Sequence, residues 1–237
     1  MLFEWTESKI DLYVRASKET GFHRKLAEQI IPYFDKNDEV ADIGCGPGLI
    51  DFDISPHVKK INAIDIDPKI IGFLKEEVER NNIDNIAPSI GDAETIDGVP
   101  CDVVLFCYFN SIGEHMHKLI GAARRLAIII MHGAGTAGKP SKISANVRKT
   151  NALDMEEILS SHGYSYTKKE LKLDFSQPLK TTEEARKFLE MYCTEEVPEE
   201  RKNKIEEGLK NLKHSNHVFY PYSITNMKDA TIFIVTK

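Results

Sequence analysis

The hydrophobic residues of this chain follow two periods in turn, one typical of strands and one typical of helices. Short apolar runs predict buried strands at 39–43, 61–65, 86–90, 102–106 and 126–131. The stretches between these runs carry apolar residues at helical spacing, so strand and helix alternate. After Asp102, the rest of the run 102–106 is continuously apolar, as expected for a central strand of a parallel sheet. The pattern therefore predicts a parallel sheet with helices on both faces.

Two helices are predicted before the first strand. The first, 7–19, is amphipathic. The second, 22–34, has an apolar residue at every fourth position: Phe22, Leu26, Ile30 and Phe34. Pro32 is expected to weaken the last turn of this second helix. Further along the chain, Asp67 is expected to cap the helix that follows the second strand.

The late part of the chain interrupts the alternation. Strands are predicted at 164–174 and 230–236, with helical patterns between them. We therefore predict an α/β fold, a doubly wound, seven-strand, mostly parallel sheet built from residues 1–174 and 228–237. A helical insertion over 175–227 precedes the last strand, and we expect it to form a lid over the substrate.

A glycine-rich turn after the first predicted strand is the strongest chemical signal in the chain. It reads Asp42-Ile43-Gly44-Cys45-Gly46-Pro47-Gly48. Its glycines remove Cβ atoms where a ligand must come close. Asp65 ends the second strand, 21 positions after Gly44, and its carboxylate can accept hydrogen bonds from both hydroxyls of a ribose. A nicotinamide-binding turn needs a third glycine where this chain has Leu49, so that alternative fails.

These motifs resemble those of the class I S-adenosylmethionine-dependent methyltransferases. The first motif of that family, an acid, an apolar residue and Gly-x-Gly-x-Gly, matches residues 42–48. The acid that ends the family's second strand matches Asp65, and the acid after the third strand matches Asp92. The fourth-strand motif matches residues 101–106. The resemblance covers roughly 20–135 by motif and the remainder by element order.

The resemblance implies S-adenosylmethionine as the cofactor and suggests its contacts. The methionine portion is expected over the glycine loop, with Asp42 orienting its amino group directly or through water. Asp65 is expected on the ribose and Asp92 on the adenine amino group. Tyr13 can belong to a lid over the cofactor or pack on the helix 22–34. The expected cofactor-binding residues are Asp42, Gly44, Cys45, Gly46, Gly48, Asp65, Ile66, Asp92, Ala93, Tyr108 and Tyr13.

The acceptor usually sits after the fourth strand in this family, where this chain has Tyr108, Phe109 and Asn110. Enzymes that methylate exocyclic amines of nucleic acids carry Asn or Asp followed by Pro-Pro and an aromatic residue there. This chain lacks those prolines, which counts against an adenine or cytosine amine as the acceptor. Tyr108 and His132, at the end of the fifth strand, are the candidate catalytic residues. A base such as His132 is needed only if the acceptor must lose a proton.

Other polar clusters leave alternatives open. The basic cluster at 139–149 can bind an anionic acceptor or simply be solvated. His115 and His117 are two residues apart on a predicted helix, so they do not share a face, and no metal site is predicted. Some aromatic residues of the insertion are expected in its core and others in an apolar acceptor pocket.

Composition narrows the partners. The chain has 237 residues, a net charge of −6 and 41% hydrophobic residues, which is typical of a globular protein with no polyanion as its default partner. The apolar runs are too short to span a bilayer and the N-terminus has no apolar signal region, so we expect a cytoplasmic protein. The four cysteines form no Cys-x-x-Cys pair and are expected to be reduced. The oligomeric state stays open, and a homodimer is compatible with the sequence.

The expected function is in-line methyl transfer from S-adenosylmethionine to a small-molecule acceptor. Nitrogen, oxygen and carbon acceptors remain open, as does a metal-bound or corrinoid-type acceptor. One alternative is a protein or RNA methyltransferase, which the basic cluster at 139–149 would support. The other is a non-catalytic protein that binds S-adenosylmethionine without transferring its methyl group.

Overall fold

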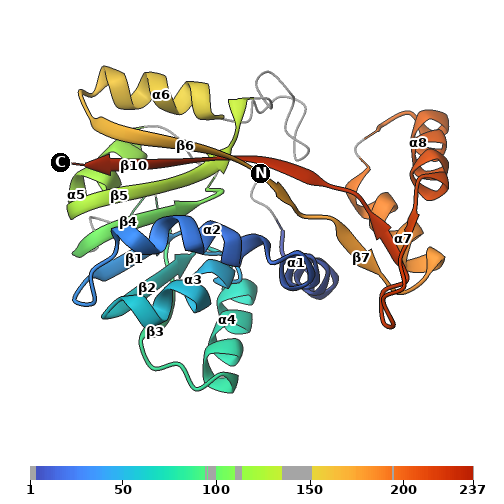
Figure 1. Ribbon diagram of the computed structural model, residues 1–237, viewed down its shortest axis with the longest axis horizontal. Helices are drawn as coiled ribbons and strands as arrows, with labels where there is room; N and C mark the ends of the chain where they lie inside the picture. Colours follow the sequence, from blue (N-terminus) through green and yellow to red (C-terminus); the bar gives the residue numbers. More distant parts are fainter. Residues whose placement is uncertain are drawn as a thin grey trace.

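A seven-stranded sheet forms the centre of the molecule. The computed structural model describes residues 4–93, 95, 100–109, 114–134, 151–193 and 195–236. The strand order is β3-β2-β1-β4-β5-β10-β6, and β10 runs antiparallel to both of its neighbours (Figure 1). The strands are β1 (Glu39–Ile43), β2 (Lys60–Asp65), β3 (Ile86–Ile90), β4 (Cys101–Cys107), β5 (Ala123–His132), β6 (Ser165–Asp174) and β10 (Met227–Thr236). This order confirms the predicted doubly wound, mostly parallel sheet.

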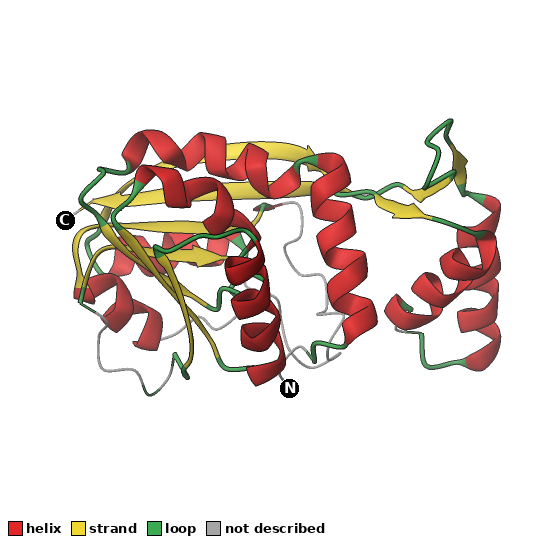
Figure 2. Cartoon of the chain, turned by 90° about the horizontal axis from the view of Figure 1, so that it is seen from below, coloured by secondary structure: helices red, strands yellow, loops and turns green. Residues whose placement is uncertain are grey.

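Helices cover both faces of this sheet (Figure 2). Side chains alternate along each strand, so neighbours such as Val40 and Ala41 enter opposite cores. One core packs the sheet against α1 to α4, and the other packs it against α5 and α6. The helices are α1 (Glu7–Thr20), α2 (Phe22–Ile30), α3 (Leu49–Ile54), α4 (Pro68–Arg80), α5 (Glu114–Ala122) and α6 (Ala152–Ser161).

Helix boundaries follow the capping residues, with one correction to the sequence prediction. Asp67 accepts a hydrogen bond from the amide two residues on, at 2.8 Å, and caps α4 as predicted. The predicted helix 22–34 is too long, because α2 ends at Ile30 and continues only as a short 3₁₀ turn. Pro32 lacks an amide hydrogen and its ring clashes with the preceding turn, so the α-helical ladder cannot continue.

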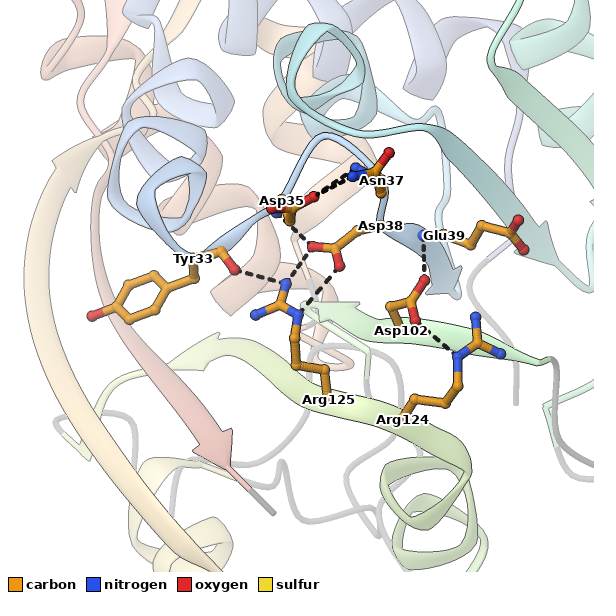
Figure 3. Close-up of polar contacts among 8 residues, drawn as sticks. All are labelled: Tyr33, Asp35, Asn37, Asp38, Glu39, Asp102, Arg124 and Arg125. Atoms are coloured by element: carbon orange, nitrogen blue, oxygen red, sulfur yellow. Dashed lines mark hydrogen bonds and ion pairs between the residues drawn. The ribbon is translucent and has the colours of Figure 1, made fainter.

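An ion-pair network closes the amino ends of the central strands (Figure 3). Arg125 of β5 donates to Asp38 at 3.2 Å and to the carbonyl of Tyr33 at 2.9 Å. Asp102 of β4 accepts a hydrogen bond from Arg124 at 2.8 Å and another from the first amide of β1 at 2.9 Å. These contacts join three strands and the loop before β1. Ligands of open α/β sheets bind at the opposite, carboxyl edge, so the functional site is expected there.

The insertion lies between β6 and β10, beyond the carboxyl ends of the parallel strands (Figures 1 and 2). Its elements are β7 (Gln177–Leu179), α7 (Thr182–Tyr192), α8 (Pro198–Lys210), β8 (Lys213–His214) and β9 (Tyr222–Ile224). The short strands form a separate sheet in the order β7-β9-β8, so the insertion is not purely helical as the sequence suggested. The Phe175 amide donates to the Asn226 carbonyl at 2.8 Å, so the two connecting segments lie side by side.

A buried arginine ties α1 to the insertion. Arg15 is 6% exposed and donates to Glu184 of α7 at 2.8 Å and to the carbonyl of Pro178 at 3.3 Å. It also pairs with Asp11 one turn earlier, and its guanidinium lies 5.1 Å from the centre of the Tyr220 ring. A second face of α1 is therefore buried, and the amphipathic pattern alone did not predict it.

No helix among the described residues is long and apolar enough to span a bilayer.

Candidate functional site

The glycine-rich loop between β1 and α3 opens the carboxyl edge of the sheet. Gly44, Gly46 and Gly48 have φ values of 73°, 54° and 63°, in a left-handed region that residues with a Cβ rarely adopt. The amides of Gly44 and Cys45 donate to the carbonyl of Ile64 at 2.8 and 3.0 Å. These bonds hold the loop against the end of β2. The loop therefore presents mainly backbone to a ligand at this edge.

Asp65 orients this loop and keeps acceptor capacity for a ligand. Its Oδ2 accepts the Gly46 amide at 2.9 Å, and its Oδ1 accepts the Asp67 amide at 3.0 Å. An ionised carboxylate has about four lone-pair sites, so each oxygen can take a second donor. The carboxylate is thus held in place by backbone on both sides before any ligand binds.

The ends of β2 and β3 add an apolar surface and a second acid. Ile90 of β3 pairs with Asp65, and Ile66 follows Asp65 directly. These isoleucines are 60% and 38% exposed, respectively. Asp92 comes two residues after Ile90, and the next residue, Ala93, packs against the core. An exposed apolar surface next to the Asp65 carboxylate suits a flat heterocycle that carries a ribose.

Two acids lie beneath the loop. Asp42 of β1 and Asp51 of α3 are both 0% exposed. Their carboxyl groups face each other at hydrogen-bonding distance, and no other described group donates to their oxygens. Burial raises the pKa of Asp42 to about 7 and raises the pKa of Asp51 well above its usual range. The sequence indicated Asp42 but not Asp51, which resembles an ordinary polar residue in the first turn of a helix.

A cluster of aromatic rings covers the loop and the ends of β4, β5 and β6. Its members are Trp5, Tyr13, Phe22, His23, Tyr108, His132 and Phe175. Ring centres lie 5.2 Å apart for Tyr13 and Phe175, and 4.7 Å apart for Phe22 and Phe175. Trp5 lies over the loop, because a Cβ added to Gly46 would be 3.4 Å from its ring. We call these seven residues the aromatic cluster.

Tyr108 has two unusual features. Its φ is 54°, a strained conformation for a residue with a side chain. Its hydroxyl is buried and has no hydrogen-bond partner among the residues that the structure describes. Burial raises the pKa of Tyr108, so the hydroxyl stays protonated and can donate a hydrogen bond. The ring of His132, the other candidate catalytic residue, lies 4.9 Å from that of Tyr108.

Tyr13 is held by a buried histidine. Its hydroxyl lies 3.2 Å from Nε2 of His23, whose Nδ1 lies 2.6 Å from Oγ of Ser17. Burial lowers the pKa of His23 to about 3, so the ring is neutral and fixes the tyrosine by hydrogen bonding rather than by charge. Tyr13 therefore packs on α2 and also contacts Trp5, which covers the loop, so its two expected roles are compatible.

Several expected residues make no contribution to the described site. The basic cluster at 139–149 and Asn110 lie outside the described residues, as does the side chain of His115. His117 lies 2.9 Å from the hydroxyl of Tyr164, on the opposite face of the sheet.

All four cysteines are free thiols, as predicted. The described residues contain no group of three or more His, Cys, Asp or Glu side chains that could hold a metal ion.

The loop geometry predicts a large cost for any side chain at Gly48. An added Cβ would lie 2.6 Å from Leu74 Cδ1 of α4, and the φ of 63° adds strain. We expect Gly48→Ala to lower the free energy of unfolding by about 2–4 kcal/mol. Gly72→Ala is the control, because a Cβ there meets nothing within 4 Å and α4 should gain up to about 1 kcal/mol. Urea unfolding measures both, and equal stability of the two variants would contradict the loop geometry.

Comparisons with known proteins agree with this geometry. The family described as the TRM5/TYW2 methyltransferase domain matches residues 15–158, more than half of the chain. The crystal structure of YcgJ protein from Bacillus subtilis has a TM-score of 0.63 and 14% sequence identity. It covers 91% of this chain and 99% of that one, and it shows that the fold is shared.

Curated relatives match over shorter segments. A probable cobalt-precorrin-6B C(15)-methyltransferase from Methanobrevibacter smithii is 37% identical over 57 residues, 24% of this chain and 30% of the relative. A tRNA (guanine(37)-N(1))-methyltransferase from Pyrococcus abyssi is 25% identical over 122 residues, 50% of this chain and 37% of the relative. The matched segments thus span less than half the length of these relatives.

Proposed function

We propose that this chain, which belongs to the TRM5/TYW2 methyltransferase domain family, transfers a methyl group from S-adenosylmethionine to a small molecule with a planar, unsaturated ring. Membership makes the chain a class I S-adenosylmethionine-dependent methyltransferase, with S-adenosylmethionine as its cofactor. The nature of the acceptor is the proposal, and the aromatic cluster is the observation that carries it.

The described residues fit the cofactor. The glycine loop presents backbone in left-handed conformations to the methionine portion, and Asp65 retains acceptor capacity for two ribose hydroxyls. We assign Asp92, two residues after the exposed Ile90, to the adenine amino group. The unpartnered carboxyls of Asp42 and Asp51 suit a positively charged ligand. When bound, the cofactor supplies a methyl group already activated by its sulfonium charge.

The aromatic cluster favours a flat, apolar acceptor. Rings from α1, α2, β4, β5 and β6 meet at the edge of the sheet next to the glycine loop. Aromatic rings stack on or meet the edge of other rings at centre distances of about 4.5–7 Å, so such a surface selects planar molecules. It also excludes water from the path of the methyl group and aligns the acceptor, which are the main tasks of the protein in an in-line displacement.

Tyr108 and His132 have different roles toward the acceptor: Tyr108 donates a hydrogen bond and His132 accepts a proton. The protonated hydroxyl of Tyr108 can donate to a heteroatom of the acceptor and hold the reacting atom in line. It cannot act as a base while it keeps its proton. The ring of His132 lies beside it and can take up a proton if the acceptor must lose one.

Methyl transfer from labelled S-adenosylmethionine tests this proposal. The acceptors are phenols, aromatic nitrogen heterocycles and a cobalt-precorrin, with total tRNA and ribosomal protein in parallel. We expect label on at least one of the ring compounds and none on the macromolecules. Label on tRNA that ribonuclease releases would overturn the proposal in favour of RNA methylation. Binding of the cofactor without transfer to any acceptor would favour a non-catalytic binding protein.

Removal of the Tyr108 hydroxyl tests its role in the same assay. Tyr108→Phe should lower the rate of transfer about tenfold, the effect of one lost hydrogen bond, and leave cofactor affinity within about threefold. Tyr164→Phe is the matched control, because that hydroxyl bonds His117 on the far face of the sheet. Equal rates for Tyr108→Phe and the unmodified protein would remove Tyr108 from the acceptor site.

RNA methylation is the second candidate function. Its support is the relative that acts on tRNA guanine, which matches half of this chain. The insertion gives it no electrostatic support, because residues 175–226 carry nearly equal numbers of acidic and basic side chains. The tRNA arm of the assay decides between the two candidates.

A further inference from the structure

Asp42 and Asp51 form the least compensated polar group in the described part of the molecule. Both side chains are fully buried, and all four carboxylate oxygens lack a donor among the described residues. Buried carboxylates normally have hydrogen-bond partners or a counter-ion, because an unpaired buried charge is costly. Two such groups facing each other resist ionising together, and a cation nearby relieves that resistance.

The pair lies directly under the loop on which we place the methionine portion of the cofactor. A Cβ built on Gly48 would be 3.2 Å from Oδ2 of Asp51. Among the described residues, the ionisable groups close enough to act on the pair are Asp65 at the end of β2, Cys45 in the loop and Cys107 at the end of β4. None of them is a cation. A positively charged ligand above the loop would therefore supply the compensation that these described groups do not.

We propose that Asp42 and Asp51 share one proton in the free protein and release it when the α-ammonium group of the cofactor binds above the loop. Asp51 thereby becomes a second counter-ion for the cofactor, behind Asp42. This inference rests on the proposed function, because it needs S-adenosylmethionine at the loop. The proton leaves to the solvent, and the pair changes from one negative charge to two as the ammonium arrives.

The pH dependence of cofactor affinity follows from the linkage between cofactor binding and proton release. Burial holds the pKa of the pair above the usual range of a carboxyl group, and a bound cation lowers it again. Between the lowered and the raised value, binding releases a proton, so affinity rises with pH in that window. Above the raised value the pair is already ionised, and affinity no longer depends on this group.

Calorimetry of the full chain in two buffers of different ionisation enthalpy tests the proposal. We expect about 0.5–1 proton released per S-adenosylmethionine or S-adenosylhomocysteine near neutral pH. 5′-Methylthioadenosine, which lacks the ammonium group, should release about a tenth of a proton or less. Binding of the first two ligands without proton release would overturn this inference alone. Failure of both to bind would overturn the proposed function with it.

Substitution of Asp51 tests whether the proton released on cofactor binding comes from the Asp42–Asp51 pair. Asp51→Asn should abolish the release and make affinity for S-adenosylhomocysteine independent of pH over about pH 6 to 8, where the unmodified protein gains up to tenfold. Asp53→Asn is the control on the same helix and should release as many protons as the unmodified protein. Asp51→Ser serves if the asparagine variant does not fold. Undiminished release from a folded Asp51 variant would place the proton elsewhere and overturn the assignment.

Discussion

Asp65→Ala is expected to weaken S-adenosylmethionine binding at least about a hundredfold, or roughly 3 kcal/mol. Two hydrogen bonds from ribose hydroxyls to a charged carboxylate are worth about 1.5–3 kcal/mol each. The same carboxylate accepts the Gly46 amide at 2.9 Å, so its removal also loosens the loop that would carry the methionine portion. Calorimetric titration with S-adenosylmethionine and S-adenosylhomocysteine measures the effect, with NAD as a ligand control.

Asp67→Asn is the matched control for this substitution. Asp67 lies two residues away and caps α4 through the Lys69 amide at 2.8 Å, and asparagine can also cap a helix. The affinity of the Asp67→Asn variant for the cofactor should stay within about threefold of that of the unmodified protein. An unchanged dissociation constant for Asp65→Ala would sink the ribose assignment, and a similar loss in both variants would point to helix α4 instead.

Deletion of the insertion is expected to abolish methyl transfer while the protein still binds its cofactor. The Phe175 amide and the Asn226 carbonyl are 2.8 Å apart, so a short glycine–serine linker can replace residues 176–225 without disturbing β6 and β10. The insertion braces α1 through Arg15, and α1 carries Tyr13 of the aromatic cluster. Loss of that alignment should lower transfer at least about a hundredfold, with cofactor affinity within about fivefold.

Arg15→Met gives a milder version of the same test. It removes the bonds to Glu184 and Pro178 and leaves every element in place. The rate of methyl transfer should fall by a larger factor than the affinity for the cofactor, as is expected for the deletion variant. Phe219→Ser, at an exposed position of the insertion, is the control and should change neither quantity. Equal loss of transfer and of cofactor binding in the deletion variant would show that the insertion is only structural.

Most of the sheet was predictable because its determinants are local. Strands β1 and β3 match the predicted bounds residue for residue, since a run of apolar residues between turn signals has few alternatives. The cap at Asp67 and the left-handed glycines of the loop follow from backbone sterics and neighbouring amides alone. The early end of α2 was one error, and its cause, Pro32, was visible in the sequence. The three short strands of the insertion were another.

The composition of the site was less predictable because distant segments supply it. Trp5, His23 and Phe175 carry no motif, and only the packing of α1, α2 and β6 brings them together. Arg15 has the pattern of a solvated helix residue, yet the insertion buries it. Asp51 belongs to no motif, and only the packing of α3 on β1 buries it against Asp42.

The sequence by itself determined the order of strands and helices around the main sheet, the glycine turn and the positions of the acids at 65 and 92, because each depends on the periodicity or sterics of adjacent residues. Only the tertiary structure decided which side chains form the aromatic cluster and which acids share a buried space. Burial and contact between residues such as Tyr13 and Phe175 are properties of the packed chain. Local patterns do not specify which residues that are distant in the sequence come into contact, and the chemistry of this site depends on those long-range contacts.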